Sequence, residues 1–137
     1  MKHTVLLATW LLPLTCQARE LVLEFHGKDM SGYTLMVEVF NSENGFLSDN
    51  KRVRAIKVKA TSNSATVLIH DLISGSYDVA AFVDRNQIGN LDRNFVGLPT
   101  ELYGFSREAR RLFGPPSFDE AKFELGDDTV SQSIHFH

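Results

Sequence analysis

The stretch Tyr33-Thr-Leu-Met-Val-Glu-Val-Phe40 carries the pattern that decides the fold. Apolar residues alternate in it with a period of two, so the odd-numbered residues from Tyr33 to Val39 fall on one face of an extended strand. The opposite face includes Met36 and Phe40, and we expect it to be partly covered as well. A short alternating run rich in β-branched and aromatic residues predicts a strand rather than a helix.

The same alternation recurs in short runs separated by turn-forming residues. Further strands are predicted at 21–25, 55–59, 65–70, 77–83, 121–125 and 131–136. Asn44-Gly45 is a strong turn signal between two of them because both residues tolerate positive φ. About seven short strands predict an all-β fold, an antiparallel β-sandwich of the immunoglobulin-like or prealbumin-like type.

The first 18 residues have the order of a secretory signal peptide. A short basic start precedes the apolar run 4–14, and small residues follow at Cys16 and Ala18. We expect cleavage after Ala18, since the apolar run is too short to span a bilayer comfortably. A buried N-terminal helix and a lipid anchor on Cys16 are the alternatives. The sequence thus predicts an exported chain, periplasmic or extracellular, with 19–137 as one domain and no transmembrane helix in the mature chain.

Composition narrows the classes of function. Cys16 is the single cysteine and lies in the predicted signal peptide, so the mature chain would have no disulfide and no thiol nucleophile. A net charge of −3 argues against a nucleic-acid partner, which requires a basic face. No serine lies in a Gly-x-Ser-x-Gly setting. We therefore expect a non-enzymatic protein without a cofactor, calcium excepted.

Oxygen-bearing side chains alternate in the loop that follows the predicted strand 77–83. The loop reads Asp-Arg-Asn-Gln-Ile-Gly-Asn-Leu-Asp from 84 to 92, a pattern that can aim several oxygens at one point. The candidate calcium ligands are Asp84, Asn86, Asn90 and Asp92. In the alternative interpretation, the first two cap a tight turn and Gly89 supplies positive φ. No Glu lies at the spacing of an EF-hand ligand, so we expect weak calcium binding or none.

A connection of roughly 30 residues, long for a segment without its own strand, joins the predicted strands 77–83 and 121–125. Within it, 106–113 is compatible with a helix that Ser106 would cap and Gly114-Pro-Pro116 would end. Its apolar side chains could cover one end of the core, or they could enclose a ligand-binding groove beneath the connection. The candidate residues for contact with a ligand or partner are Glu101, Tyr103, Phe105, Arg110 and Phe113.

Histidines form a second candidate site. His135 and His137 alternate on one face of the last predicted strand and could meet His26 or His70 on a neighbouring strand. Such a cluster would suit zinc or copper. The alternative is a solvated pair on an edge strand.

Separated blocks of the chain, in order, resemble a known family. The blocks 77–86, 89–92, 94–106 and 113–118 resemble the bacterial family of domains of unknown function numbered 2141 (DUF2141). The loop of that family reads Asp-x-Asn-x-Asn-Gly-x-Leu-Asp, and this chain has Ile88 at the third ligand position. Gly75-Ser-Tyr77 also resembles the strand entry of secreted prealbumin-like domains. The resemblance implies an exported β-sandwich and supplies no reaction.

Two classes of function remain open at this point. The first is an exported, non-enzymatic binding or envelope-associated module that contacts an unknown protein or envelope component through the long connection. The second is a periplasmic protein that binds a small ligand or calcium through the 84–92 loop. A cleft lined by Asp84, Tyr103 and Arg110 would favour ligand binding, whereas aromatic side chains buried against the sheet would favour a structural cover.

Overall fold

The computed structural model describes residues 4–11, 19–48, 50–87 and 101–137. Its strands are β1 (Glu20–His26), β2 (Thr34–Phe40), β3 (Arg54–Lys59), β4 (Ser64–His70), β5 (Gly75–Asp84), β6 (Tyr103–Phe105), β7 (Phe123–Leu125) and β8 (Val130–His135). A 3₁₀ turn, η1 (Ser106–Glu108), and one helical turn, α1 (Phe118–Ala121), lie between β6 and β7. The described chain is therefore almost entirely β-structure, as the sequence predicts.

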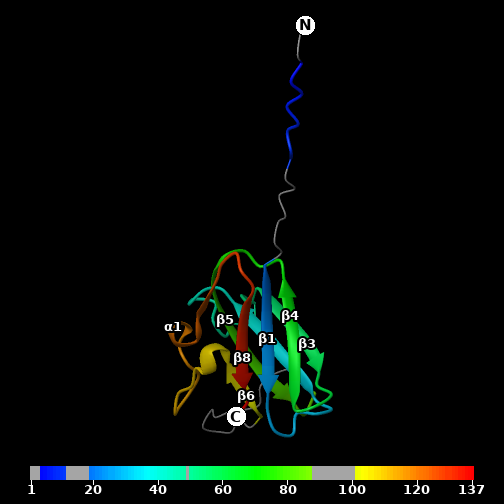
Figure 1. The fold of residues 1–137 in the computed structure, drawn as a ribbon. Helices are drawn as coiled ribbons and strands as arrows, with labels where there is room; N and C mark the ends of the chain where they lie inside the picture. The colour runs from blue at the N-terminus through cyan, green and yellow to red at the C-terminus, as the bar shows by residue number, and fades with distance from the viewer. Residues whose placement is uncertain (1–3, 12–18, 49, 88–100) are drawn as a thin grey trace.

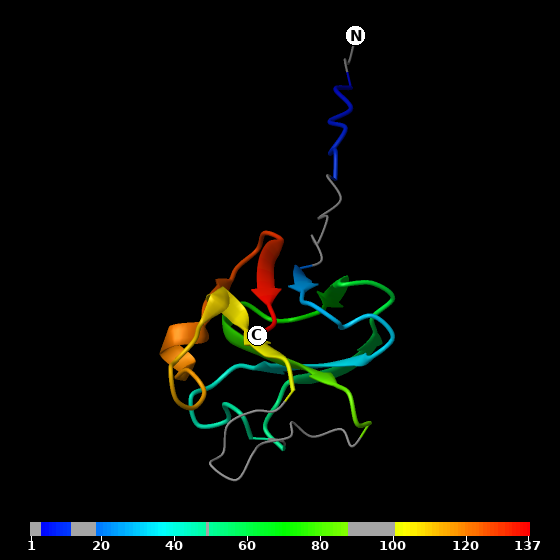
Figure 2. The same ribbon diagram turned by 90° about the horizontal axis from the view of Figure 1, so that it is seen from below.

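The strands form two sheets that pack face to face (Figures 1 and 2). One sheet has the order β4-β1-β8, and the other has the order β3-β2-β5-β6, with β7 also paired to β5. Figure 2, seen from below relative to Figure 1, shows the two layers one above the other. The predicted β-sandwich is confirmed.

The core between the layers follows from the alternation in the sequence. Leu35, Val37 and Val39 of β2 are fully buried, and the corresponding apolar residues of β1 face them from the other sheet. Tyr33 departs from the prediction: it precedes β2 and is 39% exposed, and the Arg85 guanidinium lies 5.5 Å from its ring centroid. Burial of the alternating side chains is the main force that holds the two sheets together.

The first and last strands lie side by side. β1 and β8 pair in parallel, with His26 opposite His135, whereas all other described strand pairs are antiparallel. The prediction of an antiparallel sandwich did not include this pair. As a consequence, the C-terminal ends of β1 and β8 lie next to each other at one end of the sheet, close to the C-terminus of the chain (Figure 1).

The outer face of β2 and β5 is covered, as the second apolar face of β2 predicts. Phe40 and Phe105 are buried there, and the ring of Phe46 makes edge-to-face contacts with both at 5.6 and 6.3 Å between centroids. Phe118 of α1 approaches Phe46 in the same way at 6.1 Å. Aromatic residues of β2, of the turn after it, of β6 and of α1 thus form a small second core.

Two details of that connection differ from the sequence-based expectation. It contains a strand, β6, and its expected short helix forms outside 106–113, where only the 3₁₀ turn η1 is present. Arg107 and Glu108 have φ of 58° and 54°, which no α-helix accommodates. The helix α1 lies further on instead. Its capping box, in which Ser117 and Glu120 each accept from the other's main-chain N–H, was readable as Ser-x-x-Glu.

The described part of the N-terminal region lies outside the sandwich. Residues 4–11 have no regular secondary structure, are exposed and extend away from the two sheets (Figure 1). The expected cleavage site at Ala18 falls in 12–18, outside the described residues. No helix in the described ranges is long and apolar enough to cross a membrane.

Candidate functional site

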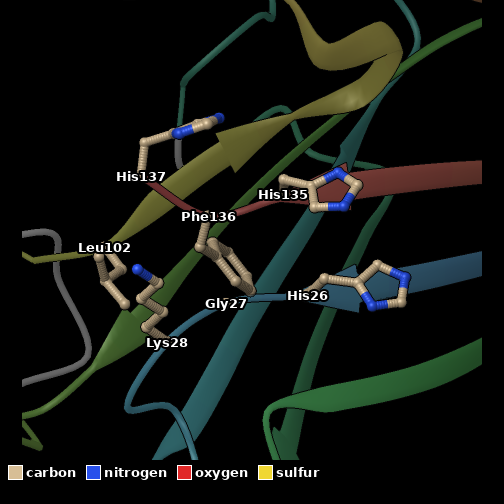
Figure 3. Close-up of a pocket in the computed structure, with 7 residues that line it drawn as sticks. All are labelled: His26, Gly27, Lys28, Leu102, His135, Phe136 and His137. Atoms are coloured by element: carbon tan, nitrogen blue, oxygen red, sulfur yellow. The ribbon is translucent and has the colours of Figure 1, made fainter.

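β1 and β8 end, and β6 begins, at one end of the sandwich. A pocket of about 510 Å³ lies there, open to solvent. It is lined by His26, Gly27, Lys28, Leu102, His135, Phe136 and His137 (Figure 3). Sequence reasoning named its histidines, but Lys28, Leu102 and Phe136 come together only through the fold.

The approach of β6 to the end of β8 forms one wall of this pocket. The main-chain N–H of His137 donates to the carbonyl of Tyr103 at 3.0 Å, and the reverse bond measures 3.3 Å. Gly104 permits this approach, since a Cβ there would lie 2.7 Å from Cγ2 of Ile134 and 2.9 Å from the carbonyl oxygen of His135. The two sheets are thereby joined at this edge.

Two of the predicted histidine ligands meet. The imidazoles of His26 and His135 stack with centroids 5.0 Å apart and planes 24° apart, and Figure 3 shows them side by side. The other possible neighbour, His70, lies opposite Glu20 at the far end of β1. Since the parallel register sets His26 beside His135, the fold selects one of the two alternatives that the sequence left open.

Glu108 of η1 holds His135 from the other side. Its Oε1 lies 2.7 Å from Nδ1 of the ring and accepts the main-chain N–H of His135 at 3.1 Å. A carboxylate can only accept here, so the Nδ1 atom of His135 carries the proton. In the neutral ring, the lone pair is therefore on Nε2, the nitrogen not held by Glu108.

The residues predicted for partner contact are distributed over three places. Tyr103, Phe105 and Arg110 line a second cleft together with Glu108, but at about 10 Å³ it has room for about one water molecule. Glu101 is buried and accepts the main-chain N–H of Arg85 at 2.9 Å, a structural role. Phe113 is exposed.

The predicted calcium loop is only partly within the described residues. Asp84 is buried at the end of β5 and Asn86 is exposed, whereas Asn90 and Asp92 lie outside the described residues. Asp84 does not line the cleft with Tyr103 and Arg110. In the described ranges, no group of three or more His, Cys, Asp or Glu side chains could enclose a metal ion.

Asp78 is a residue that sequence reasoning missed. It lies on the outer face of β5 and is fully buried, and no described group donates a hydrogen bond to either carboxylate oxygen. Burial raises the pKa of Asp78 to about 7, with Asp119 adding to the shift and Lys122 opposing it. A signal existed, because an aspartate within the run Tyr-Asp-Val-Ala-Ala-Phe-Val must be buried if both faces of that strand are covered.

A family model covers most of the chain, residues 27–133. The chain belongs to the family DUF2141, whose description is "Uncharacterized protein conserved in bacteria". Neither a curated protein nor a solved structure matches the chain. The family assignment agrees with the resemblance in the loop and its flanking blocks, and it brings no reaction with it.

Proposed function

We propose that this protein is an exported, non-enzymatic binding module that contacts a partner in the bacterial envelope through the tip of its long connection. The observation that carries the proposal is the exposure of two adjacent large apolar side chains. Leu112 is 87% exposed and Phe113 is 76% exposed. We call these two residues, together with Arg110, the contact tip.

The contact tip is not needed to complete the fold. Phe46, Phe105 and Phe118 already close the second core, and neither Leu112 nor Phe113 belongs to either apolar cluster. Aromatic residues and arginine are enriched at protein–protein contact surfaces, where a few such residues provide much of the binding energy. Their exposure costs free energy in the isolated protein, and a partner that covers them would recover it.

The two arginines at the tip differ in whether they are paired with a carboxylate of the protein itself. Arg111 donates to Glu120 through Nε, at 2.8 Å from Oε2. Within the described part of the chain, Arg110 makes no hydrogen bond and no ion pair. A partner with a carboxylate beside an apolar surface would satisfy both features of the tip.

Export is supported by the composition and by the N-terminal region. Residues 4–11 lie apart from the sandwich, and Arg19, the first residue after the expected cleavage site, pairs with Asp127 at 3.0 Å. The domain that begins at Arg19 contains no cysteine, so its folding is independent of the redox compartment. Intact-mass measurement of protein from the envelope fraction should show a chain starting at Arg19, and a mass that retains Met1 would contradict export.

Site-specific photo-cross-linking tests the contact itself. A photoreactive residue replaces Phe113 in one variant and Leu68 in the control. Leu68 is also exposed but lies on β4, in the other sheet. We expect a discrete adduct with an envelope component from position 113 and none from position 68. The same adduct yield at both positions, or no adduct from 113, would contradict the proposal.

Calcium binding by the 84–92 loop is the second candidate. It is favoured by the position of Asp84, whose buried carboxyl lies at the end of β5 where the loop begins. Ile88 removes one side-chain ligand, however, and calcium prefers six to eight oxygens. The binding-module proposal therefore takes precedence.

A further inference from the structure

We propose that His26 and His135 bind a divalent transition-metal ion such as Zn²⁺, with Glu108 as the residue that positions His135. The inference does not rest on the proposed contact at Leu112 and Phe113, although Glu108 lies two residues before Arg110 on the same connection. It rests on the parallel pairing of β1 and β8, on the stacked imidazoles and on the carboxylate behind one of them.

The two stacked rings lie near each other but must tilt before their nitrogen atoms can share a metal ion. Zinc binds imidazole nitrogen at about 2.0–2.1 Å, so two ligand nitrogens of a tetrahedral site are about 3.3 Å apart. The ring centroids are 5.0 Å apart, and nitrogen atoms at the ring edges approach further when the rings tilt toward each other. The side chain of His135 is 56% exposed and His26 is half-buried, so neither ring is locked by packing.

The hydrogen bond from His135 to Glu108 prepares the ring for coordination. Because Nδ1–H points to Oε1 of Glu108, Nε2 holds the lone pair of the neutral imidazole. Metal-binding histidines usually donate their second N–H to a carboxylate, a main-chain carbonyl or water, which orients the ring and raises its basicity. Glu108 also accepts the main-chain N–H of His135, so one carboxylate contacts both the ring and the backbone of that residue.

The surroundings predict an exchangeable site rather than a structural one. The described residues supply two ring nitrogens and no third side-chain ligand, so water would complete the coordination sphere. Glu24 lies on the same exposed face of β1, two residues before His26, and its negative charge favours a cation. Two cations oppose it: Lys28 lines the pocket together with both histidines, and Arg110 lines the small cleft together with His135 and Glu108. We therefore expect reversible binding that acid abolishes, since protons compete for the imidazole nitrogens.

Calorimetric titration with Zn²⁺ in a non-chelating buffer tests the site. The parent is the full chain without a histidine tag, carrying His3→Ala and Cys16→Ser so that the N-terminal region offers no competing ligand. We expect one ion per chain, with affinity at least about tenfold lower in His26→Ala and in His135→Ala. His70→Ala, which removes an exposed histidine at the far end of β1, is the matched control and should bind like the parent. Equal affinity in all four proteins would overturn the proposal.

Two further measurements make the test specific. In histidine ¹⁵N spectra of the parent, Zn²⁺ should shift the ring nitrogens of His26 and His135 and leave His70 unchanged; shifts at His70 alone would place the ion elsewhere. Glu108→Gln should lower the affinity by about tenfold or more and move the pH midpoint of binding, because the carboxylate no longer supports the ring. An unchanged affinity and pH midpoint in Glu108→Gln would refute the positioning role.

Discussion

Replacement of Asp78 by asparagine gives the sharpest stability prediction. The Asp78 carboxyl is fully buried on the outer face of β5, and no described donor compensates its charge. Burial raises its pKa to about 7 in the folded protein, against an ordinary value of 3.8. The folded state therefore prefers the neutral acid, and ionisation on the way to neutral pH weakens the fold.

The magnitude follows from the two pKa values. A difference of about three units corresponds to about 4 kcal/mol at 1.4 kcal/mol per unit. For a group whose pKa is raised by folding, the penalty is absent below the unfolded pKa, near 4, grows through the interval and is complete above about pH 7. Asparagine has nearly the same shape and stays neutral, so the Asp78→Asn variant should not lose folding stability through this ionisation at any pH.

Urea unfolding from about pH 4 to pH 8 measures this effect. The stability of Asp78→Asn relative to the wild type should rise by about 4 kcal/mol across that range, because other titrating groups contribute equally to both proteins. Asp128→Asn, a change at an exposed turn residue, is the control and should follow the wild type throughout. Parallel stability curves for Asp78→Asn and the wild type would show that the buried carboxyl does not titrate as argued.

Three further predictions test the connection and the loop. Ser106→Ala should lower the free energy of unfolding by about 1–3 kcal/mol in urea unfolding, because its buried hydroxyl donates to Ala121 at 2.6 Å and accepts the Val79 N–H at 2.9 Å; an unchanged midpoint would contradict this. Gly104→Ala should lower the free energy of unfolding by about 1–3 kcal/mol in the same assay, because its Cβ would clash with Ile134. Gly126→Ala, where the space is open, should leave the free energy of unfolding unchanged, and equal losses in the two variants would refute the close approach at Gly104. Calorimetric titration of the chelator-treated protein should show no calcium binding tighter than about 10 μM, and tighter binding would mean that the 84–92 loop gathers more oxygens than its side chains suggest.

The strands were largely predictable because each is a local pattern. Runs such as 33–40 and 77–83 alternate or stay apolar over enough residues to identify a strand and its buried face. β6 was not predictable in this way. Its three residues pair with β5 and meet the end of β8 only in the folded chain, so no local periodicity marks it. The parallel pairing of β1 with β8 is likewise a property of the topology.

The candidate site was also predictable only in part. The sequence identified the histidines and offered His26 or His70 as the neighbour of His135, but only the register of β1 selects His26. The role of Glu108 depends on positive φ in η1, which breaks the helix that the composition of 106–113 favours. The sequence therefore predicted which histidines could bind a metal ion. It did not predict the contact of Glu108 with His135, because that contact depends on an unusual backbone conformation.

The central claim is that the contact tip binds a partner and does not stabilise the fold. The most direct measurement compares the double variant Leu112→Ser/Phe113→Ser with the wild type in two assays. The first is thermal unfolding, and the second is the amount of the envelope component, identified by cross-linking from position 113, that each protein retains. We predict an unfolding midpoint within experimental error of the wild type and loss of retention, because both side chains are exposed. A clearly lowered midpoint with unchanged retention would contradict the claim.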